Sequence, residues 1–396
     1  MPSRPLVALD APETPDELPD FLRRLDVALL GNGPALLPLP ARPGNDLDRL
    51  RTFVTDGSPR VEGSVALVVP TSGSTGDPRL VKLTASALLT SARTTHEALS
   101  GPGHWLLALP ATHVAGLQVL VRSLVAGTEP VVVDRRDGFS VEAFTAAAAT
   151  LSDLGPRYTA LVPTQLARLL DADPAPLRQF AAVLVGGGPL PDHLLARARA
   201  AEVEVVGTYG MTETCGGVVY DGHPLPGTQV ELDGWGRIRL RGPTLFSGYL
   251  AGPSGSADSA LRLADTWFTT ADLGRFDNDG RLEVVGRTDD VLITGGVNVA
   301  PAAVEAVLAD HPRVQEVCVV GVDDSQWGQR VTAVVQGTAG GPAPTLEELQ
   351  QFAGDRLPVT ALPRALVVVP EIPMLPSGKP DRVALRSLLA ADPSSQ

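Results

Sequence analysis

Cysteine, aromatic residues and positive charge are all scarce in this chain of 396 residues. The two cysteines, Cys215 and Cys318, show no CxxC and no metal-ligand spacing, so we expect neither a disulfide framework nor a cysteine-based metal site. Aromatic residues make up only 4% of the chain, and the core must therefore consist of Leu, Val and Ala. The formal net charge of −13 argues against a nucleic-acid or anionic-membrane partner, so an anionic ligand must meet individually placed cations.

Long apolar stretches are missing as well. The most apolar one, residues 105–125, is interrupted by Pro110, His113, Gln118 and Arg122, so we expect no membrane insertion. The first residues lack the basic and apolar regions of a signal peptide. Together with the low cysteine content, these absences predict a cytoplasmic protein.

The pattern of apolar residues predicts an α/β fold. Strand-like runs alternate with amphipathic helical patterns over residues 64–210, which indicates a parallel sheet with helices on its faces. Short alternating strands separated by Gly, Pro and Asp turns then predict a β-rich subdomain. We expect a large N-terminal domain, residues 1–286, and a small α+β C-terminal domain, residues 287–396. The first 60 residues are expected to contain two helices, near residues 17–30 and 46–56.

A loop rich in hydroxyl groups and glycine follows the apolar run at residues 65–69. Its sequence, TSGSTGDPR at residues 71–79, can surround phosphate oxygens with N–H and hydroxyl donors. The Walker motif GxxxxGK[ST] does not occur in this segment, which excludes a P-loop. Taken alone, such a loop can equally be an ordinary connection.

Four later segments have side chains that suit a nucleotide site: TYGMTET at 208–214, WFTTADLG at 267–274, GRTDD at 286–290 and LPSGKPDR at 375–382. The Glu213 carboxylate, between two threonines, can hold Mg²⁺ on a phosphate. The carboxylate of Asp272 can accept hydrogen bonds from both ribose hydroxyls. Each segment also has an ordinary interpretation, such as a capping turn, an Asp–Gly turn or an exposed lysine.

Read in order, the five segments resemble the motifs of the adenylate-forming superfamily, which includes acyl-CoA synthetases, luciferases and peptide-synthetase adenylation domains. The resemblance covers residues 64–386 and implies that ATP with Mg²⁺ activates a small carboxylic acid, which coenzyme A then accepts. It assigns nucleotide binding to Thr71, Ser72, Gly73, Ser74, Thr75, Gly76, Arg79, Gly187, Gly188, Tyr209, Gly210, Thr212, Asp272 and Arg287.

The resemblance also implies catalytic and conformational roles. Lys379 would bridge the substrate carboxylate and the α-phosphate, which Thr212 would contact, and Glu213 would bind the metal. Asp289 would be the hinge of a mobile C-terminal domain. Gly295 and Gly296 would leave room for the pantetheine arm of coenzyme A. The chain departs from the family pattern at Arg79, where Lys is common, and at Leu80, where Gly is common.

Two further segments, LPATHVAGLQ at 109–118 and LVPTQL at 161–166, look like the o-succinylbenzoate–CoA ligases of menaquinone synthesis. In that scheme His113 would lie near the reacting carboxylate, although a packed or capping histidine is equally expected. The second carboxylate of the acid would need a cation or hydroxyl group. Arg122, Thr164 and Gln165 are candidates by position only, and Arg122 fits a surface position on a helix better.

Other functions stay open at this point. The acid can be another aryl or short acyl acid, the acceptor can be a separate carrier protein, and a nucleotide-binding protein without catalysis is a different class. A homo-oligomer is also left open by the sequence.

Overall fold

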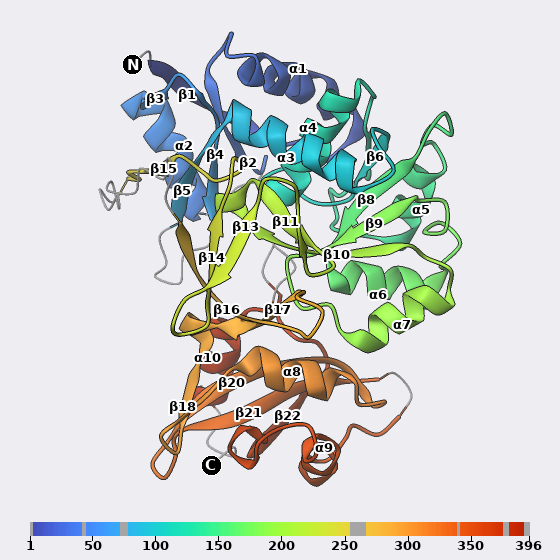
Figure 1. Cartoon of the computed structure of the whole chain (residues 1–396), viewed down its shortest axis with the longest axis vertical. Coiled ribbons are helices and arrows are strands. Elements are labelled where there is room, and N and C mark those ends of the chain that lie inside the picture. Colours follow the sequence, from blue (N-terminus) through green and yellow to red (C-terminus); the bar gives the residue numbers. More distant parts are fainter. Residues whose placement is uncertain are drawn as a thin grey trace. The chain divides into compact units, whose positions relative to one another are not determined.

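The computed structural model, shown in Figure 1, describes residues 3–41, 45–71, 78–253, 267–338, 341–374 and 380–391. The chain forms two compact units. The first comprises residues 1–187, 197–230 and 240–268, and the second comprises residues 188–196, 231–239 and 269–396. Each unit has its own sheets and its own buried core.

The first unit contains a six-stranded sheet in the order β15-β5-β4-β2-β1-β3. Strands β1, β2 and β4 are parallel, whereas β3, β5 and β15 run antiparallel to their neighbours. The strands are β1 Ser3–Asp10, β2 Ala35–Leu39, β3 Arg60–Glu62, β4 Val65–Thr71, β5 Arg79–Thr84 and β15 Gly248–Leu250.

A seven-stranded sheet in the order β12-β11-β10-β9-β8-β6-β7 completes the first unit. Its five strands from β10 to β7 are parallel, which confirms the predicted parallel sheet from β6 to β10. Strands β4 and β5, which the same prediction included, belong to the six-stranded sheet and pair antiparallel. The strands are β6 His104–Leu107, β7 Val131–Val132, β8 Arg157–Leu161, β9 Ala182–Val185, β10 Val205–Met211, β11 Gly216–Tyr220 and β12 His223–Pro224.

Three helices share one apolar core with strands of both sheets. Leu25 of α1 (Leu18–Leu29), Leu88 of α3 (Ala85–Ala98) and Leu117 of α4 (Val114–Ala126) are fully buried in it. Figure 1 shows α3 and α4 side by side. The remaining helices are α2 Asn45–Gly57, α5 Val141–Ala148, α6 Pro163–Ala172 and α7 Asp192–Ala200.

The second unit contains two sheets. A four-stranded sheet, β13-β14-β16-β17, precedes a five-stranded sheet in which β19-β18-β21-β20 are joined by β22 on β21. The strands are β13 Gln229–Leu232, β14 Arg237–Arg241, β16 Phe268–Phe276, β17 Leu282–Arg287, β18 Leu292–Thr294, β19 Val297–Val299, β20 Val314–Asp324, β21 Gly328–Gly337 and β22 Ala365–Val369.

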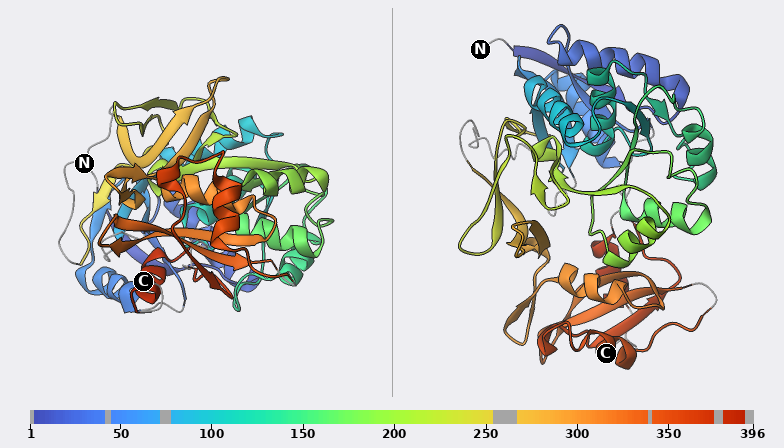
Figure 2. Two further views of the ribbon diagram at one scale, coloured as in Figure 1. Left: turned by 90° about the horizontal axis from the view of Figure 1, so that it is seen from below. Right: turned by 45° about the vertical axis from the view of Figure 1, so that its right-hand side comes forward.

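Alternation along β20 sends side chains to opposite faces of the five-stranded sheet. Val317 and Val319 join the core under α8 (Pro301–Ala309) and α9 (Leu346–Ala353). Cys318 and Val320 join the core under α10 (Arg382–Ala391) on the other face. Figure 2 gives two further views of these helices and the sheet. Short 3₁₀ turns are η1 Pro15–Glu17, η2 Thr212–Thr214, η3 Thr288–Asp290 and η4 Val359–Ala361.

The predicted α/β class is confirmed, with one difference near the N-terminus. The helices predicted near the N-terminus are present as α1 and α2, but strands β1 and β2 were not expected there. The domain boundary at residue 287 and the hinge at Asp289 stay predictions. Among the described helices, none is long and apolar enough to cross a membrane.

Candidate active site

Predicted site residues gather at one edge of the seven-stranded sheet. Strands β6, β8, β9 and β10 are parallel, so their carboxyl ends lie at the same edge, where open α/β sheets bind ligands. The residues that follow these strands are His113 after β6, Thr164 and Gln165 after β8, Gly187 after β9, and Tyr209, Gly210, Thr212 and Glu213 at the end of β10.

The turn from β10 to β11 fixes Thr212 and Glu213 by backbone geometry. A Cβ atom at Gly210 would lie 2.0 Å from the Gly216 carbonyl oxygen, so only glycine fits there. Buried Thr214 accepts a hydrogen bond from the Met211 N–H at 2.9 Å and donates to Gly216 O at 2.6 Å. The Thr214 hydroxyl is therefore structural, and Thr212 and Glu213 stay the candidates for a ligand.

Glu213 is held at both its backbone and its carboxylate. Its carbonyl oxygen accepts from the Phe246 N–H at 2.8 Å, and its Oε1 accepts from the Tyr249 hydroxyl at 2.9 Å. Burial first, and then the Glu213 charge, raise the pKa of Tyr249, so its hydroxyl keeps its proton. Tyr249 was not predicted because it lies 36 residues from its partner in the sequence.

The ends of the predicted phosphate loop lie in the same unit as Glu213. Thr71 pairs with Arg79 across β4 and β5, and the Arg79 guanidinium lies 5.8 Å from the centroid of the Tyr249 ring. Ser72, Gly73, Ser74, Thr75 and Gly76 lie outside the described residues.

Arg122 is buried, which corrects the expectation that it lies on the surface. Its side chain is 3% exposed, lies 4.9 Å from the centroid of Trp105 and donates to the Tyr220 hydroxyl at 3.4 Å. Burial lowers the pKa of Arg122. Within the described ranges, no carboxylate is among the groups that shift the pKa of Arg122, and neither Arg122 Nε nor Gln118 Oε1 has a hydrogen-bond partner. The two side chains are one helical turn apart on α4.

Three further residues are candidates for the acid site: Gln165, His113 and Thr164. Gln165 accepts from the Val162 N–H at 3.1 Å and donates to Ala108 O at 3.5 Å, so its amide already caps α6. His113 is the half-buried N-cap residue of α4, with no side-chain hydrogen bond to the helix backbone. Gln165 therefore has a capping role that was not predicted, whereas His113 makes no capping hydrogen bond, and a role for His113 or Thr164 at the acid stays a prediction.

In the second unit, Asp272 and Arg287 face each other across β16 and β17. Arg287 donates to Asp272 at 2.8 Å and to Asp289 at 3.2 Å, and Asp272 is 6% exposed. Burial lowers the pKa of Arg287, but the neighbouring carboxylates, Asp272 foremost, outweigh it and leave that pKa raised. The structure therefore joins two predicted ribose ligands and the predicted hinge residue in one ionic cluster.

Gly295 and Gly296 form the two-residue turn between β18 and β19. Their φ angles of +57° and +76° suit a type I′ hairpin, which requires positive φ at both positions. This turn explains both glycines without a ligand, so their contact with coenzyme A stays a prediction. Gly188 also belongs to this unit, and Lys379 lies outside the described residues.

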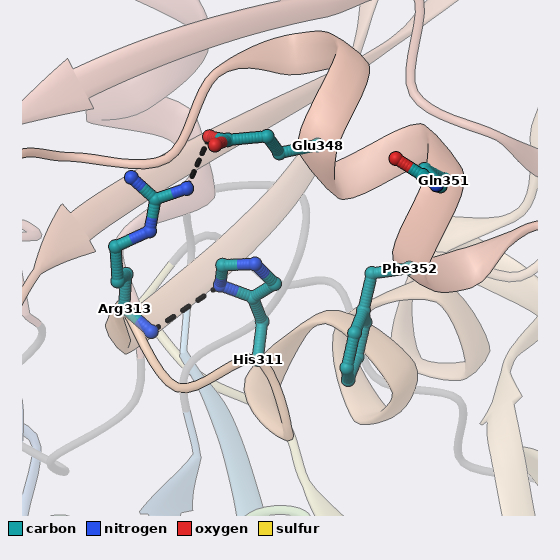
Figure 3. Close-up of a pocket in the computed structure, with 5 residues that line it drawn as sticks. All are labelled: His311, Arg313, Glu348, Gln351 and Phe352. Atoms are coloured by element: carbon teal, nitrogen blue, oxygen red, sulfur yellow. Dashed lines mark hydrogen bonds and ion pairs between the residues drawn. The ribbon is translucent and has the colours of Figure 1, made fainter.

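Figure 3 shows a pocket elsewhere in the second unit, lined by His311, Arg313, Glu348, Gln351 and Phe352. Arg313 pairs with Glu348, and its backbone N–H donates to His311 Nδ1 at 3.2 Å. Arg313 thus contacts both His311 and Glu348, and none of the five lining residues is a predicted site residue.

The donor set at Glu213 fits a metal that arrives with its nucleotide. Nowhere in the described part of the chain do three His, Cys, Asp or Glu side chains gather to hold a metal. Mg²⁺ commonly binds through one or two carboxylates together with substrate phosphates. Glu213 offers one half-buried carboxylate for a site of this kind.

Comparison with known proteins gives a consistent result. The model of the family described as "AMP-binding enzyme" matches residues 40–250, and that described as "AMP-binding enzyme C-terminal domain" matches residues 303–379. A Mycobacterium tuberculosis protein named "Probable 2-succinylbenzoate–CoA ligase" is 44% identical over 92% of this chain and 94% of its own length. A Bacillus licheniformis protein named "2-succinylbenzoate–CoA ligase" is 36% identical over 79% and 68%, respectively.

A solved structure supports the same fold over nearly the whole chain. The o-succinylbenzoate CoA synthetase of Bacillus subtilis, in complex with the acyl-adenylate intermediate OSB-AMP, is 25% identical, with a TM-score of 0.76. The similarity covers 96% of this chain and 87% of the other.

Proposed function

This chain belongs to the family of AMP-binding enzymes, and on that premise we propose that it joins o-succinylbenzoate to coenzyme A at the expense of ATP. In the first step a substrate carboxylate oxygen attacks the α-phosphorus, and pyrophosphate leaves. In the second step the thiol sulfur attacks the acyl carbon, its proton is lost, and AMP leaves. The products are the acyl-CoA thioester, AMP and pyrophosphate. We propose that the reaction takes place in the cytoplasm.

The observation that carries the choice of acid is the buried Arg122. A charge removed from water without a partner is costly, and it is tolerated where a ligand supplies the opposite charge. o-Succinylbenzoate has two carboxylates, of which only one is activated. We propose that Arg122, with Gln118 one turn away, receives the ring carboxylate and that the succinyl carboxylate reacts near the edge of the sheet.

The first step needs cations because a carboxylate and a phosphate repel each other. We propose that Lys379 lies between them and stabilises the charge that develops as the bond forms. Thr212 would hold the α-phosphate, and Glu213 would hold Mg²⁺, which neutralises phosphate charge when it is bound. The tail of ATP would be held by the loop and its flanks: Thr71, Ser72, Gly73, Ser74, Thr75, Gly76 and Arg79.

Asp272 and Arg287 would bind the ribose, and Gly187, Gly188, Tyr209 and Gly210 would line the adenine and acyl sites. We propose that residues 287–396 turn about Asp289 between the two steps. The turn would withdraw Lys379 and bring Gly295 and Gly296 to the pantetheine arm.

Product analysis tests the function directly. The enzyme is incubated with ATP, Mg²⁺, coenzyme A and o-succinylbenzoate, and the thioester is detected by mass spectrometry. A panel of benzoate, succinate and 4-oxo-4-phenylbutyrate, which lacks the ring carboxylate, runs in parallel. Preferred formation of o-succinylbenzoyl-CoA supports the proposal. A preferred monocarboxylate, or transfer only to a carrier protein, would contradict it.

A further inference from the structure

We infer that Tyr249 is a positioning residue for ATP activation: its hydroxyl fixes the Glu213 carboxylate in the orientation that receives Mg²⁺ with the nucleotide. The inference rests on the proposed function, which assigns Glu213 to the metal. Tyr249 contacts Glu213, and the proposed function gives it no role in binding the acid or coenzyme A.

The hydrogen bond leaves the carboxylate free to bind a cation. The Tyr249 hydroxyl lies 2.9 Å from Glu213 Oε1. An ionised carboxylate accepts at two oxygens, with about four lone-pair sites, so one bond from a hydroxyl leaves Oε2 for a metal. A phenolic hydroxyl is a neutral donor near pH 7, so it orients the carboxylate without adding negative charge.

The ring that carries this hydroxyl is itself fixed. It meets the fully buried Phe246 ring edge-on, with centroids 4.9 Å apart, and Phe246 meets Phe268 in the same way at 5.2 Å. Pairing of Tyr249 with Val81 fixes the register of β15 on β5, and the Arg79 guanidinium lies over the Tyr249 ring. The hydroxyl therefore has little freedom to follow Glu213, and Glu213 must adapt to it.

One short segment thus holds Glu213 at two points, since the Phe246 N–H binds its backbone and Tyr249 binds its side chain. A glutamate without such partners loses rotamer freedom when it binds a cation. Partners that orient a metal ligand in advance typically change metal affinity about 10- to 100-fold. Tyr249 is expected to act in this way on the Mg²⁺-dependent part of ATP binding.

The experiment measures that part separately from turnover. Binding of α,β-methylene-ATP is followed by calorimetry in excess Mg²⁺ and again in EDTA. The Kd in EDTA divided by the Kd in Mg²⁺ is the metal ratio, and it measures how much the metal strengthens binding. Tyr249→Phe is expected to lower this ratio about tenfold and to leave the Kd in EDTA unchanged. Glu213→Gln should remove the dependence on Mg²⁺, and Tyr249→Phe should add nothing in that background.

Tyr158→Phe is the matched control, because it deletes a tyrosine hydroxyl that donates to Gly101 O at 3.0 Å in the same unit. Its ratio should equal that of the wild type. Glu213→Asp tests the same contact by changing the carboxylate instead of the hydroxyl. The shorter side chain leaves the packing of the Tyr249 ring intact but moves the carboxylate away from the hydroxyl, so the ratio of the Kd in EDTA to the Kd in Mg²⁺ should also fall. Melting temperatures verify folding of every variant.

A wild-type ratio in Tyr249→Phe overturns the inference, as does equal weakening in Mg²⁺ and EDTA, which would indicate general damage. If Tyr249→Phe does not fold, an unchanged ratio in Glu213→Asp overturns it. These outcomes are independent of the acid, so failure of the proposed function, seen as absent o-succinylbenzoyl-CoA, is recognised separately.

Discussion

The two units differ in the partners that they give to an arginine lying below the surface. In the second unit, Arg382 meets the buried carboxylate of Glu305 at 2.8 Å, and Glu305 also accepts from the Val319 N–H at 2.6 Å. In the first unit, Arg122 is 3% exposed and meets an indole face and a tyrosine hydroxyl instead of an acid. A neutralised pair serves the fold, whereas an unneutralised cation suits an anionic ligand.

Arg382 also begins α10, directly after the segment that bears Lys379. The described ends of that segment are paired, with Met374 bridged to Pro380 and the Asp381 N–H donating to Pro373 O at 2.8 Å. Arg382 and Lys379 thus have different predicted roles: the first is structural, and the second acts in the chemistry.

The largest expected effect is on stability. Arg382→Met leaves the Glu305 charge buried without its partner, and we expect a loss of about 3–5 kcal/mol in the free energy of unfolding of the second unit. Hydrogen exchange of the β20 and β21 amides, together with calorimetry, measures this loss.

Arg122→Met is the matched variant in the first unit. It removes a buried charge that has no acidic partner among the described residues, so stability should be unchanged or higher. If both variants unfold with equal ease, the contrast between the two arginines is wrong.

Lys379→Ala should separate chemistry from structure within the second unit. We expect carboxylate-dependent exchange of pyrophosphate into ATP to fall about 10²- to 10³-fold, the usual cost of losing one group that stabilises developing charge. The melting temperature and the reaction of preformed acyl-adenylate with coenzyme A should change little. Equal losses in both half-reactions would refute the role of Lys379 in adenylation.

Arg122→Gln should sharpen the substrate assignment. It removes a charged hydrogen bond to the ring carboxylate, worth about 1.5–3 kcal/mol, so kcat/KM for o-succinylbenzoate should fall about 10- to 100-fold. With 4-oxo-4-phenylbutyrate, the variant and the wild type should perform alike, since that acid lacks the carboxylate. Equal losses for both acids would show that Arg122 does not recognise that group.

The sequence was most informative where structure and chemistry are local. The apolar runs that became β4, β8 and β9 and the carboxylates that follow strands were recognisable from pattern alone. Strand β1 was missed because Arg4 and Pro5 interrupt its pattern, and β2 because it contains Pro38. Proline is unfavourable inside a sheet, so sequence rules argue against such a strand.

Contacts between distant residues were beyond the sequence. The sequence around Arg122 predicts a surface position on a helix. The residue that Arg122 contacts in the structure, Tyr220, lies 98 positions later in the chain. The same applies to Tyr249, whose partner Glu213 was predicted while the tyrosine was not. Conversely, the Gly295–Gly296 pair was assigned to a ligand, although the positive φ angles of a tight hairpin already require glycine there.

The smallest expected effect concerns His96, which is buried beside Arg122 in the first unit. Burial first, and then the Arg122 charge, lower the pKa of His96 from 6.5 to about 4, and its Nε2 accepts from the Trp105 N–H at 3.3 Å. Because the folded state resists protonation of His96, the unfolded state binds more protons between these pH values. The stability of the first unit should therefore fall as the pH drops from about 6.5 towards 4.

Arg122→Gln removes the lesser of the two causes, so the pKa of His96 should rise and the loss of stability in acid should become shallower. Histidine ring resonances followed by NMR between pH 4 and 8 give this pKa directly, with His96→Gln identifying the signal. An unchanged pKa in Arg122→Gln would mean that the Arg122 charge is already neutralised, and Arg122 would then resemble Arg382 after all.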